Sequence, residues 1–127
     1  MIYTVTFNPA IDYVIHTDKI TMGKVNKYSG EKTYFGGKGI NVSYVLAELG
    51  IKSTALGFVA GFTGKNIEDI VTNHGCRTDF VYLKEGLSRI NVKVMGKPET
   101  EINGNGPCIS DDDVKVQNAN LIVERVA

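Results

Sequence analysis

The spacing of hydrophobic residues changes several times along the chain, and each change predicts a new element. β-Branched and aromatic residues dominate residues 2–7, so this segment is predicted to be a strand that stops at Asn8-Pro9. A helical spacing of apolar residues then predicts a helix over residues 39–49, which Gly50 ends. Its apolar stripe consists of Val42, Val45, Leu46 and Leu49.

Two more strands flank a second predicted helix. Residues 53–59 are almost all apolar or small, which is typical of a buried strand. Thr63 is the predicted N-cap of the helix, and Gly75 is its predicted end. The helical spacing is that of Ile67, Ile70, Val71 and His74. Residues 78–83 form the third strand, and this alternation of strands and helices predicts an α/β fold with parallel crossovers.

A separate, more exposed sheet is predicted as well. Residues 89–95 alternate between apolar and polar side chains, as in a strand with one wet face. A turn at residues 96–98 would let residues 99–103 pair back as a hairpin. Extended segments at residues 13–20 and 27–35 are the expected partners of this hairpin.

The last part of the sequence gives a mixed signal. Ser110 precedes three aspartates, which predicts a capping box and the start of a helix. Residues 114–120 show no clean apolar stripe, and residues 121–123 resemble the beginning of a strand. We therefore expect the chain to stop partway through a fold.

Composition narrows the function classes. The 127 residues are 43% hydrophobic and 22% charged, which suits a single globular domain. A formal net charge of zero gives no general attraction to nucleic acid or anionic membranes. No stretch has the length of a membrane span, and residues 1–5 do not begin a signal peptide. Cys76 and Cys108 lack metal-type spacing, so a reduced, cytoplasmic protein is expected rather than a secreted one with a single disulfide.

A glycine-rich turn is the most informative local motif. Gly36, Gly37 and Gly39 precede the first helix, where glycines let the backbone approach a ligand closely. The helix start adds unpaired N–H groups and the positive end of the helix dipole, and Lys38 adds a full charge. This combination suits a phosphate, a polyol or a carboxylate. The Gly-Lys-Ser/Thr ending of a nucleotide P-loop is absent, because Gly39 follows Lys38.

Two polar residues are candidates for binding a ligand beside this turn. Asp12 follows the first strand, and ligands of open α/β sheets gather beyond the carboxyl ends of strands. Its carboxylate can accept hydrogen bonds from sugar hydroxyls, although a solvated turn residue is the competing interpretation. Asn41 lies in the first turn of the helix, off the apolar stripe; a polar helix-end residue is the competing interpretation, but the adjacent glycine loop favours ligand contact.

Three basic residues are candidate phosphate ligands. Lys24 and Lys38 can supply point charges, and Arg89 can supply a bidentate fork. Each could instead be a solvated surface charge. His16 and His74 attract no catalytic assignment, and no serine–histidine or cysteine–histidine arrangement is evident.

Seven motifs together resemble the bacterial 1-phosphofructokinases, members of the ribokinase-like (PfkB) carbohydrate kinases, which also include tagatose-6-phosphate kinase. The motifs, in order, are Asn8-Pro9-Ala10-Ile11-Asp12, Gly36-Gly37-Lys38-Gly39-Ile40-Asn41-Val42, Ala55-Leu56-Gly57-Phe58, Gly61-Phe62-Thr63-Gly64, Thr78-Asp79-Phe80-Val81, Arg89-Ile90-Asn91-Val92-Lys93 and Thr100-Glu101-Ile102-Asn103. The resemblance extends from residue 1 to about residue 113.

This resemblance implies a three-layer α/β/α core with a small antiparallel β lid, formed by residues 13–35 and 89–103. It implies transfer of the ATP γ-phosphoryl group, with Mg²⁺, to a phosphorylated ketose, most closely fructose 1-phosphate. Asp12, Gly36, Gly37 and Asn41 would contact the sugar, and Lys24, Lys38 and Arg89 its phosphate. The lid would cover the sugar and form a homodimer contact.

Members of that family are more than twice as long. Their second half carries a Gly-Ala-Gly-Asp motif with the catalytic aspartate and most of the ATP and Mg²⁺ site. We therefore expect residues 1–127 to be the amino-terminal, sugar-binding part of one such domain, with no catalytic residue and no metal site of its own. A tagatose-6-phosphate kinase, a non-catalytic sugar-phosphate-binding fragment and an unstable truncated product are the alternatives.

Overall fold

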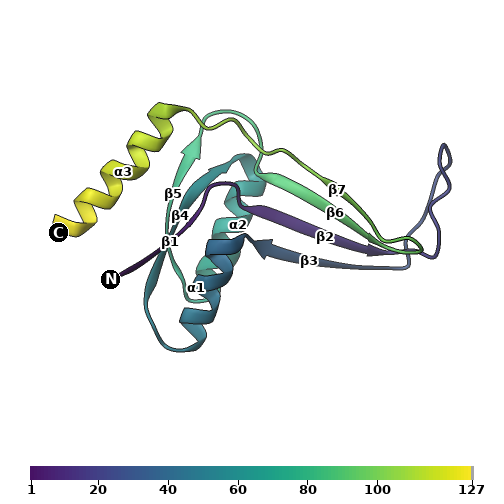
Figure 1. Ribbon diagram of the computed structural model, residues 1–127, viewed down its shortest axis with the longest axis horizontal. Helices are drawn as coiled ribbons and strands as arrows, with labels where there is room; N and C mark the ends of the chain where they lie inside the picture. The colour runs from purple at the N-terminus through teal and green to yellow at the C-terminus, as the bar shows by residue number, and fades with distance from the viewer. Residues whose placement is uncertain (127) are drawn as a thin grey trace.

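Two sheets divide the molecule into a core and a protruding arm (Figure 1). The computed structural model describes residues 1–126, with side chains through residue 118. The core sheet has the order β1-β4-β5, and all its strands run parallel. Its strands are β1 (Ile2–Thr6), β4 (Ser53–Ala60) and β5 (Arg77–Leu83). These boundaries confirm the three strands predicted for the core.

Helices cover both faces of the core sheet. They are α1 (Lys38–Glu48), α2 (Gly61–Asn73) and α3 (Asp111–Val126). On one face, Ile40 of α1 and Val71 of α2 pack with Val59 of β4 in a buried cluster. On the other face, Phe58 of β4 and Val81 of β5 pack with Val114 of α3. The predicted three-layer α/β/α arrangement is therefore confirmed.

The second sheet projects from the core as a lid and has the order β3-β2-β6-β7 (Figure 1). Its strands are β2 (Ala10–His16), β3 (Gly30–Gly36), β6 (Arg89–Met95) and β7 (Thr100–Asn103). The two hairpins are antiparallel as predicted, but β2 and β6 run parallel, so the lid is a mixed sheet rather than a purely antiparallel one. Both strands leave the core in the same direction, which imposes this pairing.

Helix α1 does not present its apolar stripe to the sheet. Val42, Val45 and Leu49 are 51%, 55% and 67% exposed, whereas Ile40 and Ser43 are fully buried. Buried hydroxyls explain this rotation of the helix, because Ser43 and Thr4 of β1 share a hydrogen bond of 2.7 Å. Buried hydroxyl groups need hydrogen-bond partners, and this bond satisfies both of them. Helix α1 therefore packs on the sheet through the face that carries Ser43.

Two sequence predictions at helix and strand boundaries are wrong. Thr63 does not cap α2, because the helix begins at Gly61 after the N-cap residue Ala60; the Thr63 hydroxyl instead donates to the Ser88 carbonyl at 2.8 Å. Residues 121–123 belong to α3 rather than to a strand. Once the Ser110 cap has started the helix, each added residue costs little, so helix growth overrides the β propensity of Ile122 and Val123.

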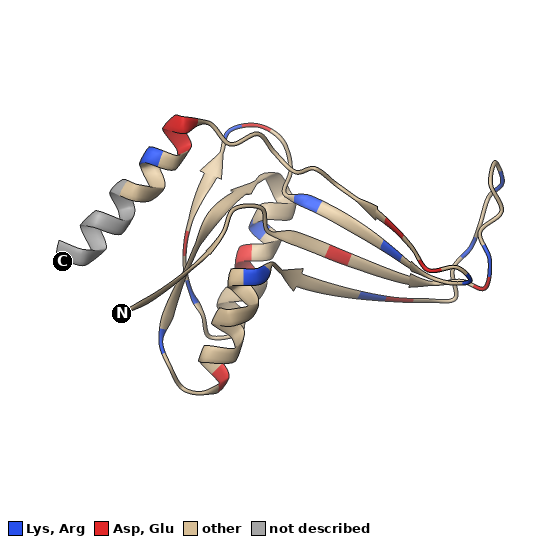
Figure 2. Cartoon of the chain, viewed as in Figure 1, with Lys and Arg blue, Asp and Glu red and all other residues tan. Residues whose placement is uncertain are grey.

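The predicted start of α3 is confirmed. The Ser110 hydroxyl accepts a hydrogen bond from the Asp113 amide at 3.1 Å, and the Asp113 carboxylate accepts one from the Ser110 amide at 2.8 Å. Three aspartates occupy the first turn, where Figure 2 shows acidic residues gathered. Their negative charges complement the positive end of the helix dipole.

Candidate functional site

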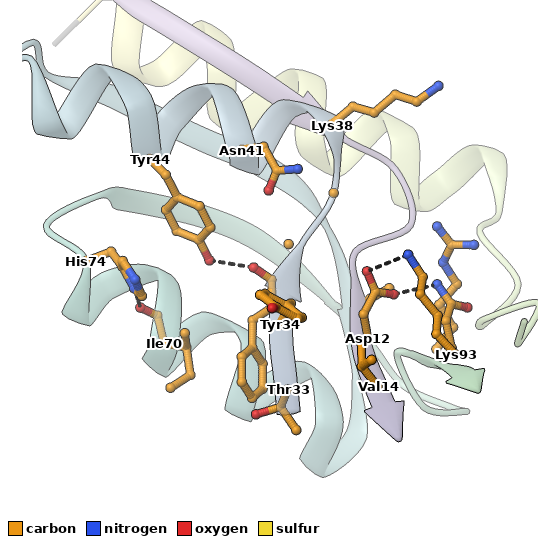
Figure 3. A pocket seen from close by; sticks show the side chains of 16 residues that line it. Asp12, Val14, Thr33, Tyr34, Lys38, Asn41, Tyr44, Ile70, His74 and Lys93 are labelled. Carbon is orange, nitrogen blue, oxygen red and sulfur yellow. Dashed lines mark hydrogen bonds and ion pairs between the residues drawn. The ribbon is translucent and has the colours of Figure 1, made fainter. Parts of the chain in front are cut away.

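A hollow of about 790 Å³ lies where the lid sheet meets helices α1 and α2. Its walls come from β2, β3 and β6 of the lid and from the loop that begins α1 (Figure 3). Six of the seven predicted site residues line it, namely Asp12, Gly36, Gly37, Lys38, Asn41 and Arg89. Residues more than 70 positions apart in sequence therefore converge on one concave surface.

The glycine loop is held against the end of β1 at close range. The Ile40 amide donates a hydrogen bond of 3.0 Å to the Thr6 hydroxyl. A Cβ atom on Gly37 would lie 2.3 Å from the Thr6 methyl group, and one on Gly39 would lie 2.5 Å from the Val5 carbonyl oxygen. Both positions therefore need glycine because a side chain would collide with β1.

Glycine is also required beside Asn41. A Cβ atom on Gly36 would lie 2.7 Å from Asn41 Oδ1, so a larger residue would displace this amide. The Asn41 amide nitrogen of the main chain donates to the Gly37 carbonyl at 2.8 Å, which closes the first turn of α1. The Asn41 side chain thus sits over the glycines at the positive end of the helix, where it can contact a polar ligand.

Asp12 is supported from two sides by residues of β6. Asn91 Nδ2 donates a 2.9 Å hydrogen bond to Asp12 Oδ1, and Lys93 Nζ lies 3.8 Å from Asp12 Oδ2 (Figure 3). The Asp12 side chain remains 32% exposed, so its carboxylate can still accept hydrogen bonds from a ligand.

Arg89 contributes a guanidinium to the same wall of the hollow. Its Nε donates to the Asn8 carbonyl at 3.2 Å, which anchors the side chain at the wall of the hollow. Arg89 is partly buried, and a charge there is screened less by solvent than one on an open surface.

The two candidate lysines are placed differently. Lys38 lines the hollow, but its side chain extends away from the Asp12 carboxylate (Figure 3). Lys24 is exposed in the connection between β2 and β3, where Asn26 Nδ2 donates to its carbonyl at 2.9 Å, and it is not among the lining residues. The fold therefore does not bring Lys24 to the hollow of its own chain.

Sequence reasoning missed Asn91 and Lys93. Both alternate with Arg89 on the polar face of β6, which is turned toward the hollow, at positions that pair with Asp12 and Val14 of β2. The period-two pattern contained this signal, because every second residue of a strand faces the same side of a sheet. Recognising it requires knowing that β6 pairs with β2, which no local pattern reveals.

The opposite end of the hollow is formed by Tyr44 and His74. The Tyr44 hydroxyl donates to the Phe35 carbonyl at 2.8 Å, and the two rings lie 4.7 Å apart. Burial raises the pKa of Tyr44 to about 12, with a smaller contribution from Cys76, so the phenol stays neutral near pH 7. His74 Nδ1 contacts the Ile70 carbonyl at 2.9 Å, in keeping with a structural role.

Other chemistry is sparse in the described part of the chain. No three His, Cys, Asp or Glu side chains there gather in a way that could hold a metal ion. Both cysteines are free, Cys76 buried and Cys108 exposed. Within residues 1–126, no helix combines the length and apolarity that crossing a bilayer requires.

Comparison with known proteins identifies the relatives of this site. Residues 3–126 match the family model described as "pfkB family carbohydrate kinase". The 1-phosphofructokinase of Bacillus subtilis is 50% identical over 91% of this chain. The D-tagatose-1-phosphate kinase of Bacillus licheniformis is 44% identical over 87% of it. The chain spans only 38% and 36% of these two relatives.

A solved structure from Staphylococcus aureus, assigned as a phosphofructokinase, gives the same result in three dimensions. It superposes with a TM-score of 0.85 and 47% identity over 92% of this chain, which corresponds to 38% of the solved chain. Fold, sequence and family model agree over the glycine loop, the lid and the core sheet. This chain belongs to the pfkB family of carbohydrate kinases.

Proposed function

We propose that this chain supplies the sugar-phosphate-binding part of a kinase that converts fructose 1-phosphate to fructose 1,6-bisphosphate with ATP. The observation that carries the proposal is the single hollow that Asp12, the glycine loop and Arg89 share. Its 50% identity to a 1-phosphofructokinase supports the choice of substrate. The chain spans less than two-fifths of that relative, so the reaction belongs to a larger assembly of residues.

Each residue of the hollow has a role that follows from its chemistry. Asp12 accepts hydrogen bonds from two neighbouring sugar hydroxyls, and Asn41 donates or accepts another. Arg89 and the amino end of α1 attract the phosphate that the ketose already carries. Gly36 and Gly37 allow the sugar ring to approach the backbone. Lys38 can swing toward the phosphate because its side chain is long and flexible.

The proposal assigns binding and shielding to this chain, and no catalytic base. We expect ATP and Mg²⁺ to be held mainly by residues outside the 38% of the 1-phosphofructokinase relative that this chain matches. Closure of the lid over the sugar would exclude water, which otherwise competes as the phosphoryl acceptor. An apolar hollow of about 230 Å³ on the lid, lined by Ile15, Val92 and Val94 among others, supports a homodimer contact there. The free cysteines fit a cytoplasmic protein.

A tagatose phosphate is the second candidate substrate. It is favoured by the 44% identity to a D-tagatose-1-phosphate kinase and by the 34% identity to the tagatose-6-phosphate kinase of Staphylococcus epidermidis. Tagatose and fructose differ only in the configuration of one ring hydroxyl. Discrimination between them therefore depends on which hydroxyls Asp12 and Asn41 contact.

Calorimetric titration of the chain tests the proposal without requiring catalysis. Fructose 1-phosphate should bind with a stoichiometry of one and more tightly than fructose or inorganic phosphate alone. Asp12→Asn should weaken sugar-phosphate binding about tenfold, because a charge-assisted hydrogen bond is lost. A flat titration of the wild-type chain contradicts the proposal, and tighter binding of tagatose 1-phosphate reverses the substrate assignment. Turnover of ATP by this chain alone contradicts the assignment of a binding part.

A further inference from the structure

Asn91 is an enclosed polar side chain next to Asp12 at the wall of the hollow. It is only 7% exposed and lies on β6 directly opposite Asp12 of β2. A carboxamide at such a position must satisfy both its oxygen and its nitrogen, because a buried polar atom without a partner costs free energy. The identity of its two partners therefore indicates what the residue does.

The two partners fix the orientation of the amide. Asn91 Nδ2 donates to Asp12 Oδ1 at 2.9 Å, and Asn91 Oδ1 accepts from the Gly104 amide at 3.2 Å. An ionised carboxylate can only accept, and a main-chain N–H can only donate. The reversed amide would place oxygen against oxygen at Asp12 and nitrogen against nitrogen at Gly104. The Gly104 amide is shared with the Ile90 carbonyl at 3.3 Å, so the contact with Asp12 decides the orientation.

The segment that holds Asn91 is itself tied to the rest of the site. Gly104 follows β7, and a Cβ atom there would lie 3.0 Å from the Ile90 carbonyl oxygen. One residue later, the Asn105 carbonyl accepts from Asn8 Nδ2 at 2.9 Å. The Asn8 carbonyl in turn accepts from Arg89 Nε. Residues 104 and 105 thus brace the supports of both Asp12 and Arg89 as the chain leaves the lid.

We propose that Asn91 is a positioning residue, which fixes the Asp12 carboxylate for sugar hydroxyls and is itself fixed by the Gly104 amide. The inference rests on the proposed function, because it concerns the same sugar-phosphate site. With Oδ1 already accepting from Asn91, the remaining lone pairs of Asp12 point in defined directions toward the hollow. Lys93 restricts the carboxylate less, because its ammonium lies at 3.8 Å in a partly exposed ion pair.

Asn91→Asp is the sharpest variant because it keeps the size and the acceptor for Gly104 but replaces the donor to Asp12 with a second negative oxygen. It should weaken fructose 1-phosphate binding at least about tenfold, since the carboxylate loses its donor and is repelled. Binding of inorganic phosphate, which does not need Asp12, should change less than about twofold. Asn103→Ala is the matched control, because Asn103 pairs with Asn91 across the ladder but is exposed.

A double-mutant cycle separates positioning from direct contact. In an Asp12→Ala background, Asn91→Asp should cost less than about twofold in fructose 1-phosphate affinity, because no carboxylate remains at position 12 to be oriented. The same loss in both backgrounds, or an equal loss for inorganic phosphate, overturns the proposal. So does wild-type affinity in Asn91→Asp. If the amide resonances of Asn91→Asp are no longer dispersed, this variant does not fold. Asn91→Ala is then used in its place and must meet the same criteria.

Side-chain amide exchange tests the positioning without any ligand. The Asn91 Nδ2 protons should exchange with water at least about tenfold more slowly than those of Asn103, and Asp12→Ala should remove this protection. Unchanged exchange in Asp12→Ala overturns the inference. If the wild-type chain binds no sugar phosphate, the proposed function fails, while this exchange measurement still decides whether Asn91 holds Asp12.

Discussion

The hydroxyl of Thr6 accepts a 3.0 Å hydrogen bond from the main-chain amide of Ile40, and so joins the end of β1 to the first turn of α1. Ile40 is fully buried, and Thr6 is nearly so. The bond satisfies one of the free amides at the helix start from a neighbouring strand rather than from a capping side chain, since Gly37 at the N-cap has none. The position of the glycine loop is therefore set by the core sheet.

Gly39→Ala should destabilise the chain by about 1–3 kcal/mol, because the added methyl group collides with the main chain of β1. Its Cβ would lie 2.5 Å from the Val5 carbonyl oxygen, an atom that cannot move without shifting the strand. Urea unfolding followed by circular dichroism measures the loss.

Gly30→Ala is the matched control for this substitution. Its Cβ would meet only His16 Cδ2, at 3.8 Å, which is an ordinary contact. Equal unfolding midpoints for Gly39→Ala and wild type would show that α1 can move away from β1 freely.

Arg89→Ala should weaken fructose 1-phosphate binding by about 1.5–3 kcal/mol, because a charge-assisted contact to the phosphate is lost. Arg89→Lys should recover only part of the affinity, since lysine keeps the charge but lacks the bidentate fork. Calorimetry at two salt concentrations checks both variants. Lys97→Ala, on the same lid but outside the hollow, serves as the control. Wild-type affinity in Arg89→Ala would return Arg89 to a purely structural role.

Gln117→Ala should destabilise the packing of α3 on the core sheet by about 1–3 kcal/mol. Gln117 is buried; its Oε1 accepts from the Gly57 amide at 2.8 Å, and its Nε2 donates to the Asp79 carbonyl at 3.1 Å. Truncation would leave both main-chain groups without these partners. Exchange of the Gly57 amide with water should accelerate in Gln117→Ala. In the control variant Asn118→Ala, which changes an exposed residue of the same helix, exchange at Gly57 should stay unchanged. Slow exchange at Gly57 in Gln117→Ala would contradict this role.

Acid should loosen the start of α3 before it unfolds the core. Hydrogen bonds from the Ser110 amide and hydroxyl lower the pKa of Asp113 below its ordinary value of 3.8. The ionised carboxylate of Asp113 is thus favoured in the folded state. The stability that it adds to the helix start is fully present above pH about 4 and is lost as the pH falls through the lowered pKa. Amide chemical shifts of Ser110 and Asp113 measured from pH 6 downward should report this change. Asp113→Asn should abolish the pH dependence, and a persistent transition in that variant would assign it elsewhere.

Local signals in the sequence were sufficient for most elements. Glycines and capping residues located α1 and the start of α3, and the apolar run at β4 matched a strand buried along its whole length. The prediction that Thr63 is the N-cap of α2 failed because its hydroxyl donates to the carbonyl of Ser88, a partner 25 residues away. The mixed character of the lid also depends on a distant pairing, that of β2 with β6. Contacts of this range leave no periodic trace in either segment.

In the candidate site, too, local patterns predicted some residues, whereas others depend on pairings between distant segments. Asp12, Asn41 and the glycine loop could be proposed from residue type and position, and all line the hollow. Asn91 could not, because its importance arises from its neighbours Asp12 and Gly104 rather than from its place in a motif. The location of Lys24 at the outer part of the lid likewise follows only from the path of the chain between β2 and β3.

The rotation of α1 has a consequence for the behaviour of the chain in solution. The side chains of Val42, Val45 and Leu49 expose aliphatic surface to water and pack little against the core. Association of apolar surfaces strengthens on warming. This side of the helix should therefore lower the solubility of the chain. Replacing Val45 with lysine should therefore raise the solubility limit without lowering the melting temperature.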